Sequence, residues 1–97
     1  MRDYELTVLF GGRLGEKEMD KEIKSLQDLL EKNGAKISKK TDPTKKMLAY
    51  EVKKQREGFY VYFEVNLEPE KVAEVENKIR LMDNVIRHLI IAKSYKV

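Results

Sequence analysis

Two tyrosines at alternate positions, Tyr60 and Tyr62, lie in a stretch of the sequence that is also rich in lysine. Residues two apart in an extended chain point to the same side, so both rings would share one face of a strand. Aromatic rings can stack on nucleobases and nearby cations can bind phosphates, a combination typical of surfaces that bind RNA. Ordinary cross-strand packing of the two rings is the alternative. The basic residues that flank them are Lys45, Lys46, Lys53, Lys54 and Arg56.

Positive charge is concentrated around the same stretch. The 97 residues contain 20 Lys and Arg and 17 Asp and Glu, a net charge of +3. Within residues 36–56, eight basic residues less Asp42 and Glu51 give +6, which leaves −3 for the rest of the chain. This asymmetry indicates a side that faces a polyanion. A second explanation is that the lysines prevent an exposed hairpin from pairing edge to edge with other chains.

Residues that could catalyse a reaction are scarce. The one histidine, His88, lies inside an apolar run, where we expect it to pack or to face a partner. There is no cysteine, so neither a disulfide nor a thiolate metal site is expected. The glycines of residues 11–15 match neither the Gly-Lys-Ser/Thr ending of a phosphate-binding loop nor the dinucleotide fingerprint. The sequence therefore predicts a protein that is not an enzyme and that uses no cofactor or metal.

The elements that would position these residues follow from hydrophobic periodicity. In the first strand the alternation puts Tyr4, Leu6, Val8 and Phe10 on one face and Leu9 on the other, and the polar turn at residues 53–58 ends in Gly58, which tolerates positive φ. A loop or bulge near Pro43 must absorb a change of parity between two strands. Strands are predicted at residues 2–10, 35–40, 47–52, 59–67 and 85–93.

A 3.6-residue period predicts two helices. The first spans residues 16–32 and stops at Asn33-Gly34, and the second opens at Pro69, where the missing N–H costs nothing. Their buried stripes would be Met19, Ile23, Leu26 and Leu30 in the first and Val72, Val75, Ile79 and Met82 in the second.

The predicted order is β-α-β-β-α-β in one domain, residues 1–97, with a short tail at 94–97. Right-handed crossovers place both helices on one face of a four-stranded antiparallel sheet, which is an α+β, ferredoxin-like fold with its other sheet face uncovered. No apolar run approaches the roughly 20 residues that span a bilayer, and a strand pattern begins directly after Met1, without a signal peptide. A cytoplasmic protein is expected.

Four segments of the sequence, in this order, resemble the bacterial small-subunit ribosomal protein S-six (S6) family. They are Met1-Arg2-Asp3-Tyr4-Glu5, Asn33-Gly34-Ala35-Lys36-Ile37, Lys46-Met47-Leu48-Ala49-Tyr50-Glu51-Val52-Lys53 followed by Gly58-Phe59-Tyr60, and Arg80-Leu81-Met82-Asp83-Asn84-Val85-Ile86-Arg87. The third is the most specific, because it is similar to the family's basic-x-Leu-Ala-Tyr-x-Ile-Lys signature. Two positions depart from the family pattern: Thr44 stands where the family usually has Gly, and Val52 replaces the usual Ile.

The resemblance implies a structural protein of the small ribosomal subunit. It would bind the central domain of small-subunit ribosomal RNA together with ribosomal protein S-eighteen (S18), as a heterodimer. By the same resemblance Arg2, Arg80 and Arg87 would contact RNA phosphate or sugar, with the lysines and Arg56 of the basic stretch adding charge. The residues expected to pack against the partner or the RNA are Tyr50, Tyr60, Tyr62, Leu89 and Ile91.

Two other functions are compatible with the same residues. A ferredoxin-like interaction module could dimerise through its open sheet face without touching RNA. The run GFYVYF also resembles the third-strand motif of an RNA-recognition motif, which would bind single-stranded RNA by stacking bases on Tyr60 and Tyr62. In that family an aromatic residue of the first strand joins the stacking platform, whereas alternation places Tyr4 on the core side here.

Overall fold

The computed structural model describes residues 2–13, 15–52 and 54–93, so the tail expected at 94–97 lies outside the described residues. In chain order the elements are β1 (Arg2–Gly11), α1 (Glu16–Lys32), β2 (Lys36–Lys40), β3 (Thr44–Val52), β4 (Gln55–Leu67), a 3₁₀ turn η1 (Pro69–Lys71), α2 (Val72–Arg80) and β5 (Val85–Ala92). The predicted helix at residues 16–32 is confirmed at both ends, and η1 begins at Pro69 as expected.

The strands form one antiparallel sheet with the order β2-β4-β1-β5, and β3 also pairs with β4. This is the predicted ferredoxin-like order, and the loop expected near Pro43 separates β2 from β3. Residues 41–43, which include Pro43, leave the strand conformation, so β2 and β3 pair with different parts of the 13-residue β4. The backbone N–H of Thr41 still donates to the carbonyl of Tyr62 at 3.0 Å, which holds this break against β4.

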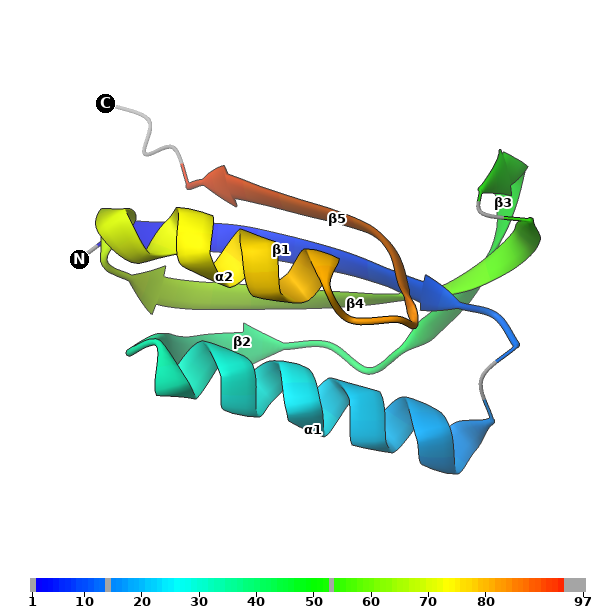
Figure 1. Ribbon diagram of the computed structural model, residues 1–97, viewed down its shortest axis with the longest axis horizontal. Coiled ribbons are helices and arrows are strands. Elements are labelled where there is room, and N and C mark those ends of the chain that lie inside the picture. The colour runs from blue at the N-terminus through cyan, green and yellow to red at the C-terminus, as the bar shows by residue number, and fades with distance from the viewer. Residues whose placement is uncertain (1, 14, 53, 94–97) are drawn as a thin grey trace.

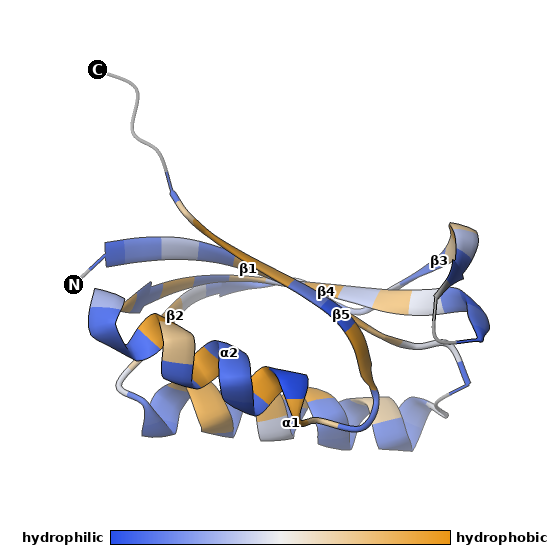
Figure 2. Ribbon diagram, turned by 45° about the horizontal axis from the view of Figure 1, so that its top comes forward, coloured by the Kyte–Doolittle hydropathy of each residue, from blue (hydrophilic) through white to orange (hydrophobic). Residues whose placement is uncertain are grey.

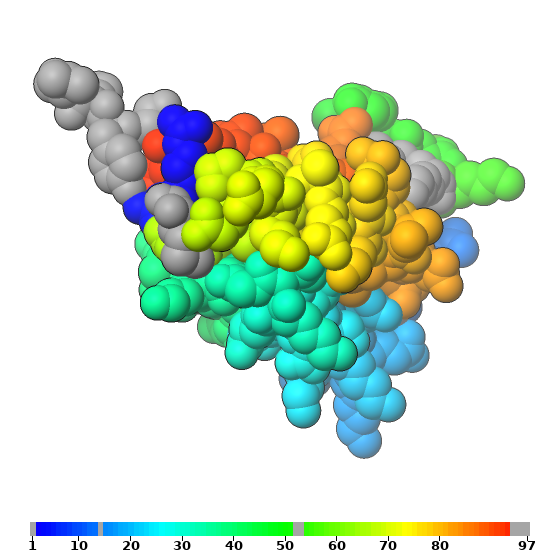
Figure 3. Space-filling view, turned by 60° about the vertical axis from the view of Figure 1, so that its left-hand side comes forward, coloured from blue at the N-terminus to red at the C-terminus, as the bar shows by residue number. Residues whose placement is uncertain are grey.

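Both helices cover the same face of the sheet and leave the other face open (Figure 2). Their buried stripes pack on the alternate residues of β1 and β4 that the sequence assigned to the core. α1 and α2 lie side by side over these strands (Figures 1 and 3). The side chains of Leu6, Val8, Phe10, Leu26, Leu30, Val61, Phe63, Val75 and Ile79 have no exposed surface. Burial of this apolar surface is the main stabilising contribution to the fold.

α1 ends through a backbone conformation that glycine supplies. Gly34 has φ = 85°, and the amide of the preceding Asn33 donates from Nδ2 to the carbonyl of Leu29 at 2.8 Å. Ala35 then donates its N–H to the carbonyl of Leu30 at 3.0 Å. The last carbonyls of the helix are therefore satisfied, and the chain turns directly into β2.

Leu9 lies on the face that alternation predicted, but it is buried there. The sequence groups it with the polar residues Asp3, Glu5 and Thr7, yet its side chain is only 1% exposed. Leu9 lies between Tyr60 on β4 and Arg87 on β5, and a Cβ built on Gly58 would lie 2.4 Å from its Cδ1. Gly58 thus makes room for a leucine buried on the otherwise open face.

The hairpin of β3 and β4 is longer than expected, and its turn is tighter. Val52 pairs with Gln55, so the strands meet within the predicted turn of residues 53–58. Among the described residues of the hairpin, the positive φ occurs at Lys54 (64°) and not at Gly58. The hairpin projects beyond the body of the molecule (Figure 1). Tyr50 on β3 is 63% exposed, because no element covers the projecting ribbon.

Candidate nucleic-acid interface

The open face of the sheet brings together most of the predicted aromatic and apolar site residues. It consists of the side chains that point away from the helices, as the strand register defines them. Thr7 pairs with Tyr62 and Leu89, Leu9 with Tyr60 and Arg87, and Glu5 with Glu64 and Ile91, so these residues form rows across β4, β1 and β5. We use the name open face for Asp3, Glu5, Thr7, Leu9, Tyr60, Tyr62, Glu64, Asn66, Arg87, Leu89 and Ile91.

One end of the open face is basic and aromatic. There β3 rises above the sheet on the side away from the helices (Figure 2). Arg87 donates from Nη2 to the hydroxyl of Tyr50 at 3.1 Å, and its Cζ lies 5.8 Å from the centre of the same ring. Lys46 holds its Nζ 5.8 Å from the ring centre of Tyr60. Cation–π contacts at these distances are favourable by about 0.5–1 kcal/mol when exposed, so the rings hold the cations in place without neutralising them.

The other end of the open face carries carboxylates that are already engaged. Burial and a hydrogen bond with Glu5 raise the pKa of Tyr62 above its ordinary value. Asn66 donates to Asp3 at 2.8 Å. A hydrogen bond from Lys93 lowers the pKa of Glu64. This end is therefore polar and carries carboxylates, whereas the other end carries cations.

Apolar side chains lie between the two ends. Leu89 is 58% exposed and Ile91 46% exposed, both unusually open for large aliphatic residues. A hollow of about 230 Å³ is lined by Thr7, Leu9, Tyr60, Arg87, His88 and Leu89. His88 itself pairs with the core residue Val8, so its register position is on the helix side.

The predicted basic residues do not form a single surface. Lys45 pairs with Phe59, on the side of the sheet opposite to Lys46, and its Nζ lies 3.3 Å from a carboxylate oxygen of Glu57 and 5.9 Å from the ring centre of Phe59. Arg80 is exposed at the last residue of α2, on the helix side. Arg2 is exposed at the first residue of β1, at the end of the sheet remote from Arg87. Lys53 lies outside the described residues.

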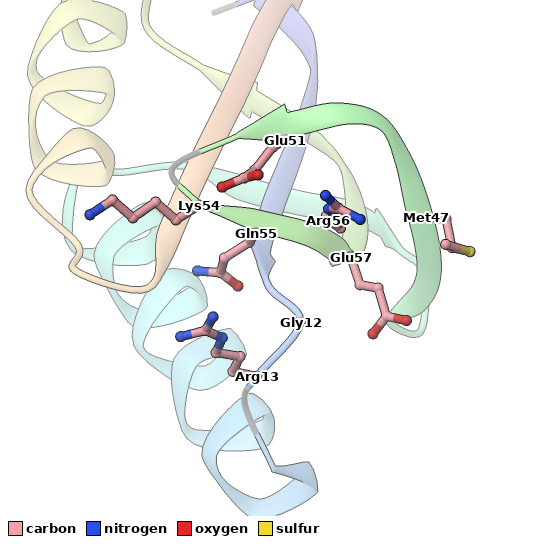
Figure 4. A pocket seen from close by; sticks show the side chains of 8 residues that line it. All are labelled: Gly12, Arg13, Met47, Glu51, Lys54, Gln55, Arg56 and Glu57. Carbon is pink, nitrogen blue, oxygen red and sulfur yellow. The ribbon is translucent and has the colours of Figure 1, made fainter.

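A second basic region lies where the hairpin meets the connection between β1 and α1 (Figure 4). We call it the hairpin groove; its volume is about 430 Å³. Sequence reasoning singled out Lys54 and Arg56 but missed Arg13 and Gln55, because their proximity depends on the hairpin folding back against the glycine-rich connection. The residues that line it are Gly12, Arg13, Met47, Glu51, Lys54, Gln55, Arg56 and Glu57.

Within residues 2–13, 15–52 and 54–93, no three His, Asp or Glu side chains come together as a metal site would require. Over the same ranges, no helix is long and apolar enough to cross a membrane.

Comparison with known proteins identifies the family. The family model described as Ribosomal protein S6 matches residues 3–92. Small ribosomal subunit protein bS6 of Halalkalibacterium halodurans is 38% identical over 90 residues, which cover 93% of this chain and 95% of that protein. The bS6 protein of Desulforamulus reducens is 31% identical over 91 residues, covering 94% and 96% of the two chains.

A solved structure supports the same assignment. The crystal structure of 30S ribosomal protein S6 from Thermotoga maritima superimposes with a TM-score of 0.89 at 25% sequence identity, covering 95% of this chain and 87% of that one. The family resemblance and the ferredoxin-like fold predicted from the sequence are thereby confirmed. The chain belongs to the ribosomal protein S6 family and is accordingly a small ribosomal subunit protein.

Proposed function

We propose that this protein binds the central domain of small-subunit ribosomal RNA as a heterodimer with ribosomal protein S18, and that it acts by binding rather than by catalysis. Family membership itself makes it a component of the cytoplasmic ribosome. The observation that carries the proposal is the open face, which has exposed apolar side chains at its centre and cations at one end.

The apolar part of the open face supports a protein partner. Leu89 and Ile91 are exposed at alternate positions of β5, and Tyr62 on β4 stands in the same row as Leu89. A sheet that is covered on only one side by its own chain commonly buries the other side against a second molecule. Glu5 and Glu64 at this end would favour a partner that combines apolar and basic side chains.

The basic end of the open face supports RNA. Arg87 and Lys46 are held over the rings of Tyr50 and Tyr60, so their charges are positioned before binding and need little further ordering. Arginine and lysine contacts to phosphates supply most of the affinity of such complexes, with little reading of base sequence.

Arg2 and Arg80 remain proposed RNA contacts from the family resemblance, and their positions constrain the complex. Arg2 and Arg87 mark opposite ends of the sheet, about 24 Å apart at 3.4 Å per residue. Arg80 lies on the helix side. An RNA that contacts all three must therefore curve around the molecule.

The test is a titration of a central-domain rRNA junction at several salt concentrations, with and without S18. If about five basic residues neutralise phosphates, log affinity should fall against log salt with a slope of roughly −3.5 to −4.5. Binding should appear or tighten when S18 is present. A matched pair of variants separates the two surfaces: Leu89→Ser should weaken the S18 interaction, whereas Lys46→Ala should mainly reduce the salt slope.

Self-association is the competing outcome. A stable homodimer that buries Leu89 and Ile91, together with no RNA binding under either condition, would replace the ribosomal proposal with a dimeric interaction module. Stacking of single-stranded RNA on the tyrosines is less favoured by the geometry, because Tyr62 is engaged by Glu5 and stands among carboxylates that repel phosphate.

A further inference from the structure

The hairpin groove carries three cations that are not neutralised. Arg13, Lys54 and Arg56 are exposed, and no ion pair joins any of them to a carboxylate in the described part of the chain. Two carboxylates also line the groove. That of Glu57 is held by Lys45 at 3.3 Å, which leaves Glu51 as the one opposing charge without a cation at ion-pair distance among the described residues. The groove therefore has an excess of positive charge.

The backbone fixes where these cations stand. Gly12 donates its N–H to the carbonyl of Glu57 at 3.1 Å, and a Cβ built on Gly12 would lie 2.8 Å from the same carbonyl oxygen. Gly11 donates its N–H to the carbonyl of Asn84 at 3.0 Å. The connection that carries Arg13 is thus hydrogen-bonded directly to β4. This backbone contact places Arg13 in the same groove as Lys54 and Arg56.

The same hydrogen bonds exclude one mode of phosphate binding. In glycine-rich phosphate loops, free backbone N–H groups surround the anion. Here the N–H groups of Gly11 and Gly12 are already donated within the protein. An anion in the groove would therefore not be held by the amides of these two glycines, and the exposed side chains are its main donors.

Gln55 adds a neutral donor to the cations. Its Oε1 is buried without a hydrogen-bond partner in the described structure, and its amide packs so closely on Gly11 that a Cβ there would lie 2.5 Å from Oε1. Figure 4 shows Gln55 and Arg13 pointing toward each other across the groove. The amide nitrogen can therefore donate to a ligand held by the arginine, while the oxygen stays inside.

We propose that the hairpin groove binds one phosphate group of an RNA backbone, held by Arg13 and Lys54, with Arg56 and the Gln55 amide alongside. This inference rests on the proposed function and adds an RNA contact on the hairpin, separate from the open face. A wide groove with exposed cationic side chains, in which the N–H groups of Gly11 and Gly12 are already used, suits a phosphate that a polymer brings into place, since a free anion would gain too few fixed contacts.

The experiment uses the full chain with S18 and the rRNA junction, with affinity measured across a salt series. The variant is Arg13→Ala combined with Lys54→Asn, because asparagine tolerates the positive φ of residue 54. Loss of one phosphate contact should make the salt slope shallower by about 0.7–0.9 and weaken binding about eightfold at 0.1 M salt. Urea unfolding of the variant checks that the fold is retained.

Two further variants test the direction and the location of the effect. Glu51→Gln removes the opposing carboxylate and should tighten RNA binding. Lys24→Ala removes one charge from the exposed side of α1 and should leave the slope within about 0.2 of that of the unmodified protein. An equal loss for Lys24→Ala, or a Glu51→Gln variant that binds more weakly, would overturn the groove as a specific site.

The outcomes also separate the two proposals. RNA binding by the unmodified protein with an unchanged slope in the Arg13→Ala/Lys54→Asn variant would overturn the groove and leave the proposed function standing. Absence of RNA binding by the unmodified protein would overturn both. Displacement of RNA by a few millimolar inorganic phosphate at constant ionic strength would reassign the groove to free phosphate, whereas no displacement is the expected result.

Discussion

Gly58 lies where the hairpin passes over β1, and replacing it with alanine should destabilise the protein. A Cβ at this position would lie 2.4 Å from Leu9 Cδ1, 3.0 Å from Leu9 Cγ and 2.9 Å from the backbone oxygen of Phe10. Ordinary contacts between such atoms are about 3.5–4.0 Å, so all three are too close. Leu9 is 1% exposed, and it lines the hollow of about 230 Å³ described above.

The size of the effect follows from what can move. Leu9 can relieve part of the overlap by moving toward this hollow, but the oxygen of Phe10 belongs to a strand paired on both sides. Overpacking of this kind typically costs about 1–3 kcal/mol in the free energy of unfolding. With a urea m-value of about 1.5 kcal/mol/M for a chain of this size, the unfolding midpoint should fall by roughly 0.7–2 M.

Equilibrium urea unfolding, followed by circular dichroism, measures this shift. Gly15→Ala is the matched control, because the nearest atom to its Cβ would be Glu18 Oε1 at 4.0 Å and its φ is −74°; its midpoint should change by less than about 0.5 M. Shortening Leu9 to valine in the Gly58→Ala background should recover part of the loss, with a coupling of about 1 kcal/mol. A Gly58→Ala midpoint within 0.2 M of that of the unmodified protein would show that the hairpin shifts freely and that Gly58 is not needed for this contact.

Three further perturbations test other parts of the structure. Tyr50→Phe removes the hydroxyl that accepts the hydrogen bond from Arg87 but keeps the ring, so the free energy of unfolding should fall by less than about 1 kcal/mol. The ¹⁵N relaxation order parameters of the hairpin should become lower. Unchanged order parameters would contradict the role of this contact. Lys93 lowers the folded-state pKa of Glu64, so this carboxylate stabilises the protein above its unfolded pKa of about 4.5, and the contribution is lost as pH falls through the lower folded pKa. Glu64→Gln should therefore reduce the loss of stability at acid pH, measured by urea unfolding between pH 2.5 and 6. An unchanged dependence of stability on pH in this range would refute the assignment. Leu26→Ala should lower the free energy of unfolding by about 2–5 kcal/mol because the side chain is fully buried, and a loss below 1 kcal/mol would contradict this packing.

Much of the fold could be predicted because local signals and tertiary packing agree. The apolar stripe of α1 and its Asn33-Gly34 stop define the helix without help from other elements. β1 has a strict alternation on its core face, and Pro69 marks where the second helical segment begins. These residues carry the same signal in the sequence as in the packed molecule.

The exceptions depend on contacts between distant segments. Leu9 is buried by side chains from β4 and β5, which alternation within β1 cannot reveal. Gly58 was interpreted as a turn residue with positive φ, whereas its lack of a side chain serves a close crossing of two strands. Sequence alone offers no rule that separates these two uses of glycine.

The candidate site shows the same limit. The tyrosines and cations were found from their types and spacing, but the contact between Arg87 and Tyr50 joins residues 37 positions apart. Equally, alternation within β3 separates Lys45 from Lys46, although the two adjoin in the sequence and were assigned to one surface. Counting charges along the sequence locates a basic segment. The three-dimensional structure is needed to show which of its side chains lie on each face of the sheet.

The division of β4 between two partners has a consequence for how the protein opens. From Gly58 onward β4 is paired with β1 and, farther along, with β2. The residues of β4 before Gly58 are paired with β3, and the hydrogen bond from Gly12 to Glu57 joins them to the rest of the sheet. A two-stranded ribbon is marginally stable by itself, so the amide protons of β3 should exchange with solvent through local opening, at a lower free energy than those of β1. A ligand that binds the hairpin would therefore slow this exchange. Ordering the hairpin would reduce the net free energy of binding, because the rest of the fold stabilises this segment only weakly.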